Sequence, residues 1–133
     1  MTTVPGSSPR PAHAGNWRQT TGARGEDLAA AYLAEQGYVI ERRNVRTRYG
    51  EIDLVAREGE TLVFVEVRCR HGESLGSALE SLTPRKRERM RTLAEAYLQT
   101  LPEPVELCRI DVVAIALRLD GTPERIDLVR DAV

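Results

Sequence analysis

Two short apolar stretches of this chain carry acidic side chains at positions where strand alternation would bury them. The first stretch holds Glu51 and Asp53, and the second begins at Phe64, holds Glu66 and is followed by Arg68. A buried carboxylate without a partner is energetically expensive, so these acids need a cation. A divalent metal ion is the cation that best suits several converging carboxylates, because it takes hard oxygen ligands. The pattern therefore indicates metal-dependent hydrolysis of phosphodiesters.

The two stretches are typical of a β-hairpin joined by a turn at Glu58–Gly59. A two-residue turn pairs Asp53 with Phe64 and places Glu66 diagonally from Asp53 on the same face, roughly 7 to 8 Å away. One Mg²⁺ can bridge that span. Glu51 shares the face of Asp53 and is a further ligand or a group that supports the ligands. A three-residue turn would send Glu66 to the opposite face and remove the site.

A second interpretation of these acids stays open. Either carboxylate alone is equally well explained by a salt bridge to a neighbouring arginine. The metal-site hypothesis rests on both acids lying on one face, with Arg68 two residues after Glu66.

The remaining sequence predicts the elements that would position these residues. We expect a helix over 24–36 ending at Gly37, a strand over 38–43, a basic connection over 42–50, strands over 51–57 and 61–69, a loop or short helix over 72–81, a helix starting at Thr83–Pro84, and strands over 109–116 and 124–130. This order predicts an α/β fold, with a mixed central β-sheet flanked by helices.

Length and composition indicate one folded domain. Residues 1–21 are rich in Pro, Gly, Ser, Thr and Ala and are expected to form a flexible tail, leaving 22–133 as the domain. No apolar run is long enough to span a membrane. Cys69 and Cys108 are too few for a zinc site or a disulfide framework, which is typical of a reducing cytoplasm.

Basic side chains gather in the middle of a chain whose net charge is only −1. Such clusters suit the DNA backbone and predict binding that weakens steeply with salt, although a charged helix face is also explained by solubility. No base-reading element is evident. The candidate nucleic-acid contacts are Arg42, Arg43, Arg46 and Arg48 in the connection, and Arg85, Arg87, Arg89 and Arg91 on the helix.

Lys86 is the only lysine of the chain. It lies four residues before Met90 and seven before Leu93, so its side chain leaves from the inward-facing stripe of its helix. Two roles are open: Lys86 approaches a phosphate at the helix N-terminus, or it extends along the edge of the core to reach water.

Asp53, followed by Glu66-Val67-Arg68, resembles the PD-(D/E)xK nuclease signature with arginine in the lysine position. More specifically, residues 22 to about 131 resemble the YraN-like family of bacterial proteins. The motifs that carry this resemblance are Gly25-Glu26, Tyr32-Leu33, Gly37-Tyr38, Arg43-Asn44, Gly50-Glu51-Ile52-Asp53-Leu54, Phe64-Val65-Glu66-Val67-Arg68, Lys86 and Arg109-Ile110-Asp111-Val112-Val113.

The resemblance implies a restriction-endonuclease-like fold and a site that uses Mg²⁺ or Mn²⁺. It adds Glu26 as a third metal ligand with Asp53 and Glu66, after the Holliday-junction-resolvase branch of the signature. The alternative for Glu26 is an acid in the first helical turn that stabilises the helix dipole. Arg68 stays protonated, so it can stabilise charge on the scissile phosphate but cannot act as a base.

We therefore expect a cytoplasmic, metal-dependent DNA endonuclease that is selective for branched or duplex structure. Asp53, Glu66, Arg68 and Lys86 are its predicted catalytic residues. A homodimer is an expectation from analogy with resolvases. The competing hypothesis is a non-catalytic nucleic-acid-binding or adaptor protein that retains the nuclease fold, and a third is a protein-interaction module that does not bind nucleic acid.

Overall fold

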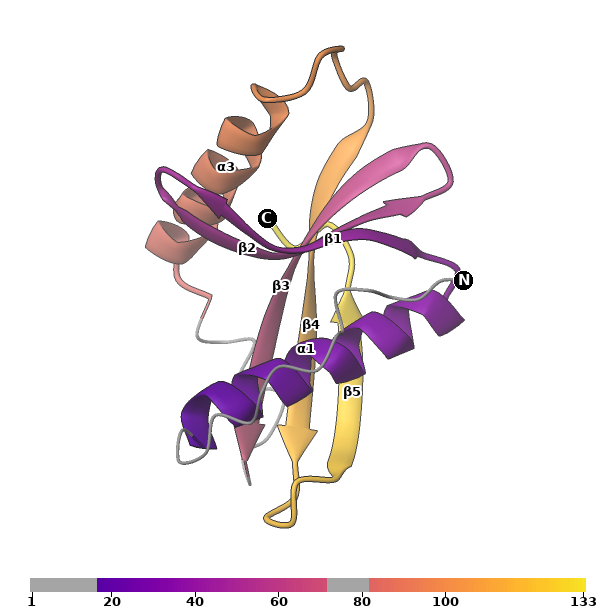
Figure 1. Ribbon diagram of the computed structural model, residues 1–133, viewed down its shortest axis with the longest axis vertical. Helices are drawn as coiled ribbons and strands as arrows, with labels where there is room; N and C mark the ends of the chain where they lie inside the picture. The colour runs from indigo at the N-terminus through magenta and orange to yellow at the C-terminus, as the bar shows by residue number, and fades with distance from the viewer. Residues whose placement is uncertain (1–16, 72–81) are drawn as a thin grey trace.

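The computed structural model describes residues 17–71 and 82–133. Its centre is a five-stranded sheet in which the strands lie in chain order (Figure 1). Strand β3 is antiparallel to β2 and parallel to β4, while the pairs β1–β2 and β4–β5 are antiparallel. The strands are β1 (Val39–Thr47), β2 (Gly50–Glu58), β3 (Thr61–His71), β4 (Cys108–Leu117) and β5 (Pro123–Val129).

The two faces of the sheet carry separate apolar clusters, because successive strand residues point to opposite sides. On one face, Val63 and Val65 of β3 pack with Ala29 and Leu33 of α1 (Trp17–Glu35). On the other face, Phe64 of β3 packs with residues of α3 (Pro84–Leu98). The predicted α/β class, with a mixed sheet flanked by helices, is confirmed.

Helix α1 begins earlier than the sequence indicated. It starts at Trp17 rather than Arg24, so residues 17–21, which we assigned to the tail, are helical. Once a helix has formed, extending it adds one hydrogen bond for each further residue. Composition alone therefore did not reveal that α1 begins at residue 17. The predicted end is confirmed: Gly37 has φ +98°, and the Tyr38 amide donates to the Leu33 carbonyl across it.

Helix α3 begins where its sequence signals predicted. Pro84 is its first residue, and the Thr83 hydroxyl caps it by accepting a hydrogen bond from the Lys86 amide at 3.2 Å. The predicted apolar stripe is buried, with Leu93, Ala94 and Tyr97 against the sheet.

The β1–β2 hairpin differs from its prediction. The expected basic connection is largely strand, because β1 continues to Thr47 and leaves only Arg48 and Tyr49 in the turn. Arginine and asparagine are poor strand formers, but β1 is an edge strand whose outer side chains can reach water. Asn44 adopts φ +53° within it.

The β2–β3 turn lies one residue later than predicted. Glu58 pairs with Thr61, so Gly59 and Glu60 form the turn. Gly59 takes φ +60° at the first central position, where type II′ hairpin turns favour glycine. The turn still contains two residues, so the predicted faces are retained.

No helix in 17–71 or 82–133 is long and apolar enough to cross a membrane. Both cysteines are free thiols. The loop or short helix expected over 72–81 and most of the predicted tail lie outside the described residues.

Candidate active site

Asp53 and Glu66 lie on neighbouring strands at the centre of the candidate site. The β2–β3 ladder ends at the pair Leu54–Val65, and Asp53 and Glu66 are the next residues beyond that pair on their strands. The predicted pairing of Asp53 with Phe64 is wrong, because the shifted turn pairs Phe64 with Val55. One Asp53 oxygen, Oδ2, accepts a hydrogen bond from the Val67 amide at 2.8 Å.

Two more carboxylates lie within electrostatic reach of Asp53. The charges of Glu26 and Glu51 both raise the pKa of Asp53, after the larger effects of burial and Glu66. Glu51 and Glu66 also line a recess beside Leu93 of α3. The structure thus brings together all four predicted acids, which we call the carboxylate cluster: Glu26, Glu51, Asp53 and Glu66.

Helix α1 reaches the sheet closely at the residue before Glu26. Gly25 is buried, and a Cβ placed there would lie 3.1 Å from both Cβ and Sγ of Cys69 on β3. Because α1 begins at Trp17, Glu26 lies well inside the helix and not in its first turn. The helix-dipole explanation for this acid is therefore wrong, since that effect is confined to the first turn.

Burial raises the pKa of three acids of the carboxylate cluster. Burial, followed by the charge of Glu66, raises the pKa of Asp53 from 3.8 to about 7. Burial also raises the pKa of Glu66, and the pKa of Glu26 is raised by burial as well. Acids that resist ionisation in this way are sites where a bound cation is stabilising.

The charges of three cationic side chains act on Glu66. Nη1 of Arg68 lies 3.6 Å from Oε2 of Glu66. The charges of Arg68, Arg89 and Lys86 lower the pKa of Glu66, against the larger effect of burial. Lys86 is exposed and does not belong to the buried stripe of α3 as its spacing predicted, although its charge acts on Glu66. Arg89 was not among the predicted catalytic residues, although its position three residues after Lys86 places it on the same helix face.

The cluster fits a hard divalent cation in its chemistry, because it offers a mostly buried carboxylate, Asp53, among further carboxylate oxygens. The fit is incomplete in geometry. Within the described ranges, no group of three or more His, Cys, Asp or Glu side chains is arranged to hold a metal ion. Oε1 of Glu26 instead accepts a hydrogen bond from Asn44 Nδ2 at 2.8 Å. Asn44 is a site residue that the sequence analysis did not single out.

The predicted DNA-contacting arginines fall into two groups. Arg42, Arg46, Arg48, Arg85 and Arg89 are exposed. Arg91 is exposed and paired with Glu88 at 3.1 Å. Arg43 is paired with Asp27 at 2.6 Å.

Arg87 is half-buried and does not line the solvated side of α3 as expected. Its guanidinium donates to the carbonyls of Leu82 and Ala132, at 3.3 and 2.7 Å, and so joins α3 to the C-terminal segment. These backbone contacts satisfy donors that the prediction assigned to phosphates.

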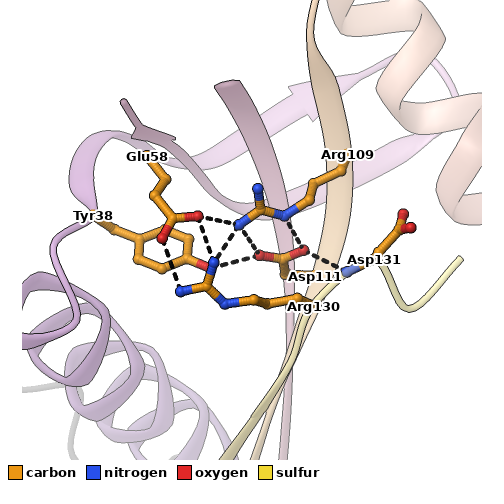
Figure 2. Close-up of polar contacts among 6 residues, drawn as sticks. All are labelled: Tyr38, Glu58, Arg109, Asp111, Arg130 and Asp131. Atoms are coloured by element: carbon orange, nitrogen blue, oxygen red, sulfur yellow. Dashed lines mark hydrogen bonds and ion pairs between the residues drawn. The ribbon is translucent and has the colours of Figure 1, made fainter. Parts of the chain in front are cut away.

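Asp111 belongs to a separate polar network and not to the carboxylate cluster (Figure 2). It is fully buried, and its two oxygens accept hydrogen bonds from Arg109, from the Tyr38 hydroxyl at 2.8 Å and from the Asp131 amide at 2.8 Å. Glu58 joins the network by pairing with Arg109 and Arg130. The role of Asp111 is therefore structural.

The fold and site define an α/β protein with a carboxylate cluster whose members come from α1, β2 and β3. The chain belongs to the family described as Uncharacterised protein family UPF0102, whose model matches residues 25–115, and this is the YraN-like family that the sequence motifs resemble. It is 50% identical over 111 residues to the UPF0102 protein of Rhodococcus jostii strain RHA1, covering 84% of this chain and 93% of that one. It is 44% identical over 115 residues to that of Pelotomaculum thermopropionicum, covering 86% and 96%.

Two solved structures show a distant likeness. One is a repair endonuclease from Pyrococcus abyssi, with a TM-score of 0.38 and 16% identity over 84% of this chain and 42% of that one. The other is Pyrococcus furiosus SfsA in complex with Ca²⁺, with a TM-score of 0.35 and 13% identity over 85% and 63%. These TM-scores are too low to transfer either protein's role to this chain.

Proposed function

We propose that this protein is a metal-dependent DNA endonuclease selective for branched or duplex structure. The observation that carries the proposal is the mostly buried carboxyl of Asp53, whose pKa is raised by the charges of Glu66, Glu26 and Glu51, while the charges of three cationic side chains act on Glu66. Phosphodiester hydrolysis by this route has two requirements: carboxylates that hold a metal cation, and cationic groups beside them that stabilise the phosphate.

Each residue of the site has a proposed role. Asp53 and Glu66 would hold Mg²⁺ or Mn²⁺, with Glu26 as the third predicted ligand. When bound, such an ion lowers the pKa of a coordinated water and polarises a phosphoryl oxygen. Lys86, Arg68 and Arg89 lie around Glu66 and would stabilise charge that develops on the phosphate. Because arginine stays protonated, Arg68 acts here as a charge and not as a base.

A non-catalytic DNA-binding protein is the second candidate. Two observations favour it: arginine occupies the signature lysine position, and no three-ligand group is arranged for a metal within the described residues. DNA binding without hydrolysis would need only the exposed arginines.

The two candidates are separated by a nicking assay on branched and linear duplex DNA with Mn²⁺ or with EDTA. We expect metal-dependent cleavage that falls at least 100-fold in Asp53→Asn, since a ligand of the catalytic ion is lost. Glu124→Gln, which changes an exposed acid on β5, is the matched control and should cleave normally. DNA binding by the wild type with no Mn²⁺-dependent cleavage would exclude the endonuclease and favour the second candidate.

A further inference from the structure

The tip of the β1–β2 hairpin presents an aromatic side chain to solvent. Tyr49 is 53% exposed, and the Arg48 guanidinium lies 5.5 Å from the centroid of its ring. The turn has its own internal hydrogen bonds: the Thr47 hydroxyl donates to the Gly50 carbonyl at 2.8 Å and accepts from the Tyr49 amide at 3.0 Å. The tip therefore holds Tyr49 on an ordered turn.

Helix α3 packs against this tip at Gly50. A Cβ placed on Gly50 would lie 2.8 Å from Arg89 Nη2 and 3.3 Å from Leu93 Cδ2, and Gly50 has φ +143°. This φ favours glycine, and an added Cβ would also displace the Arg89 guanidinium. Figure 1 shows the β1–β2 connection beside α3. Two basic segments that are distant in sequence, the hairpin and the α3 arginines, thus form one surface.

The same contact connects the tip to the carboxylate cluster. Leu93, which also lies beside Gly50, lines the same recess as Glu51 and Glu66. Along β2, Tyr49 precedes Asp53 by four residues, which is about 13 Å at roughly 3.3 Å per residue. That length corresponds to about four base steps at roughly 3.4 Å per nucleotide along one strand.

We propose that Tyr49 stacks on an unpaired base of a DNA substrate held at the carboxylate cluster, with Arg48 and Arg89 contacting the adjacent phosphates. This proposal rests on the proposed function and names the feature that makes a branched substrate preferred. An aromatic ring can cover a base only where that base is not already stacked between its neighbours in a duplex. The cations beside Tyr49 favour a polyanion over an apolar protein partner. The stacked base should lie within about four nucleotides of the cleaved bond.

The test compares affinities in EDTA, where cleavage cannot occur. Fluorescence anisotropy would measure binding of the full-length protein to a duplex and to the same duplex with a short single-stranded gap. We expect Tyr49→Ala to weaken binding to the gapped DNA by about 5- to 100-fold, the range for loss of one stacked base, and to change duplex binding less than about twofold. Tyr49→Phe should retain binding because the ring is kept. Leu119→Ala, which removes another exposed apolar side chain at a distant turn, is the matched control and should bind both DNAs normally.

Equal loss on both DNAs, or no loss on either, would overturn the stacking role of Tyr49. The endonuclease proposal fails by a different result, namely the absence of Mn²⁺-dependent cleavage. Selective loss of gapped-DNA binding supports the role of Tyr49 whether or not the protein cleaves. If Tyr49→Ala distinguished gapped DNA from duplex DNA as the wild type does, and Asp53→Asn lost cleavage, the stacking proposal would be refuted and the endonuclease proposal supported.

Discussion

Replacement of Asp53 by asparagine tests the electrostatics of the carboxylate cluster directly. The substitution removes the charge and keeps a side-chain oxygen that can accept the hydrogen bond from the Val67 amide. In the wild type, burial first and the charge of Glu66 second raise the pKa of Asp53 from 3.8 to about 7. A folded-state pKa above the ordinary value means that the folded protein binds this proton more tightly than the unfolded chain does.

The sign and size of the effect follow from those two values. Between about pH 4 and pH 7 the folded state retains a proton that the unfolded state has released, so stability falls as pH rises through that interval. At about 1.4 kcal/mol for each tenfold difference, the full interval corresponds to about 4 kcal/mol. Above pH 7, the metal-free wild type is therefore destabilised by about 4 kcal/mol relative to a protein with a neutral residue 53.

The assay is urea denaturation of both proteins at pH 5, 6, 7 and 8 in EDTA. We expect Asp53→Asn to be the more stable protein, by a margin that grows with pH towards about 4 kcal/mol. Glu26, Glu51 and Glu66 are present in both proteins, so the difference reports the charge of residue 53 together with its repulsion by these acids. Asp127→Asn, which affects a partly exposed acid paired with Arg125, should give a small difference that does not depend on pH.

Two results would refute this reasoning. The first is a difference between wild type and Asp53→Asn that stays constant from pH 5 to pH 8, and the second is a variant that is less stable throughout. Adding Mn²⁺ at pH 8 provides an independent test. It should stabilise the wild type by offsetting the buried charge and should have little effect on the variant.

Two further substitutions test how the fold is held together. Arg109→Gln should lower the free energy of unfolding by about 3 to 5 kcal/mol, because it leaves Asp111 buried without its cation. The control Arg125→Gln, in an exposed pair, should change the free energy of unfolding by less than about 1 kcal/mol. Equal effects of the two variants in urea denaturation would contradict the structural role of the network. Gly50→Ala should lower the stability by about 1 to 3 kcal/mol through backbone strain and should also displace Arg89. Gly59→Ala should lower the stability by about 1 to 2 kcal/mol and leave DNA binding unchanged, because no atom lies within 4 Å of the added Cβ. If both variants bound DNA like the wild type, the Gly50 contact would be excluded as a support for the tip.

Much of the fold could be read from local signals. The end of α1 followed from Gly37 and the start of α3 from Thr83 and Pro84, because caps depend on neighbouring residues only. The shared face of Asp53 and Glu66 followed from strand parity. That inference survived a turn misplaced by one residue, since sliding a two-residue turn along the chain keeps the faces unchanged.

Other features escaped sequence reasoning because they depend on contacts between distant segments. The edge position of β1 lets a run of arginines form a strand, and no local propensity indicates that. Arg89 became part of the site only when Gly50 packed against it. Arg87 was directed to the C-terminal segment, 45 residues away, and not to solvent.

The identity of the acids, the strands that carry them and the face they share are thus properties of the linear chain, since capping and alternation act over a few residues. Folding added the partners. It brought Glu66 and Glu26 within electrostatic reach of Asp53, brought three cations within reach of Glu66, and engaged Glu26 with Asn44. Charge interactions act through space, so the pKa of Asp53 is decided by residues as far away in sequence as α1 and β3.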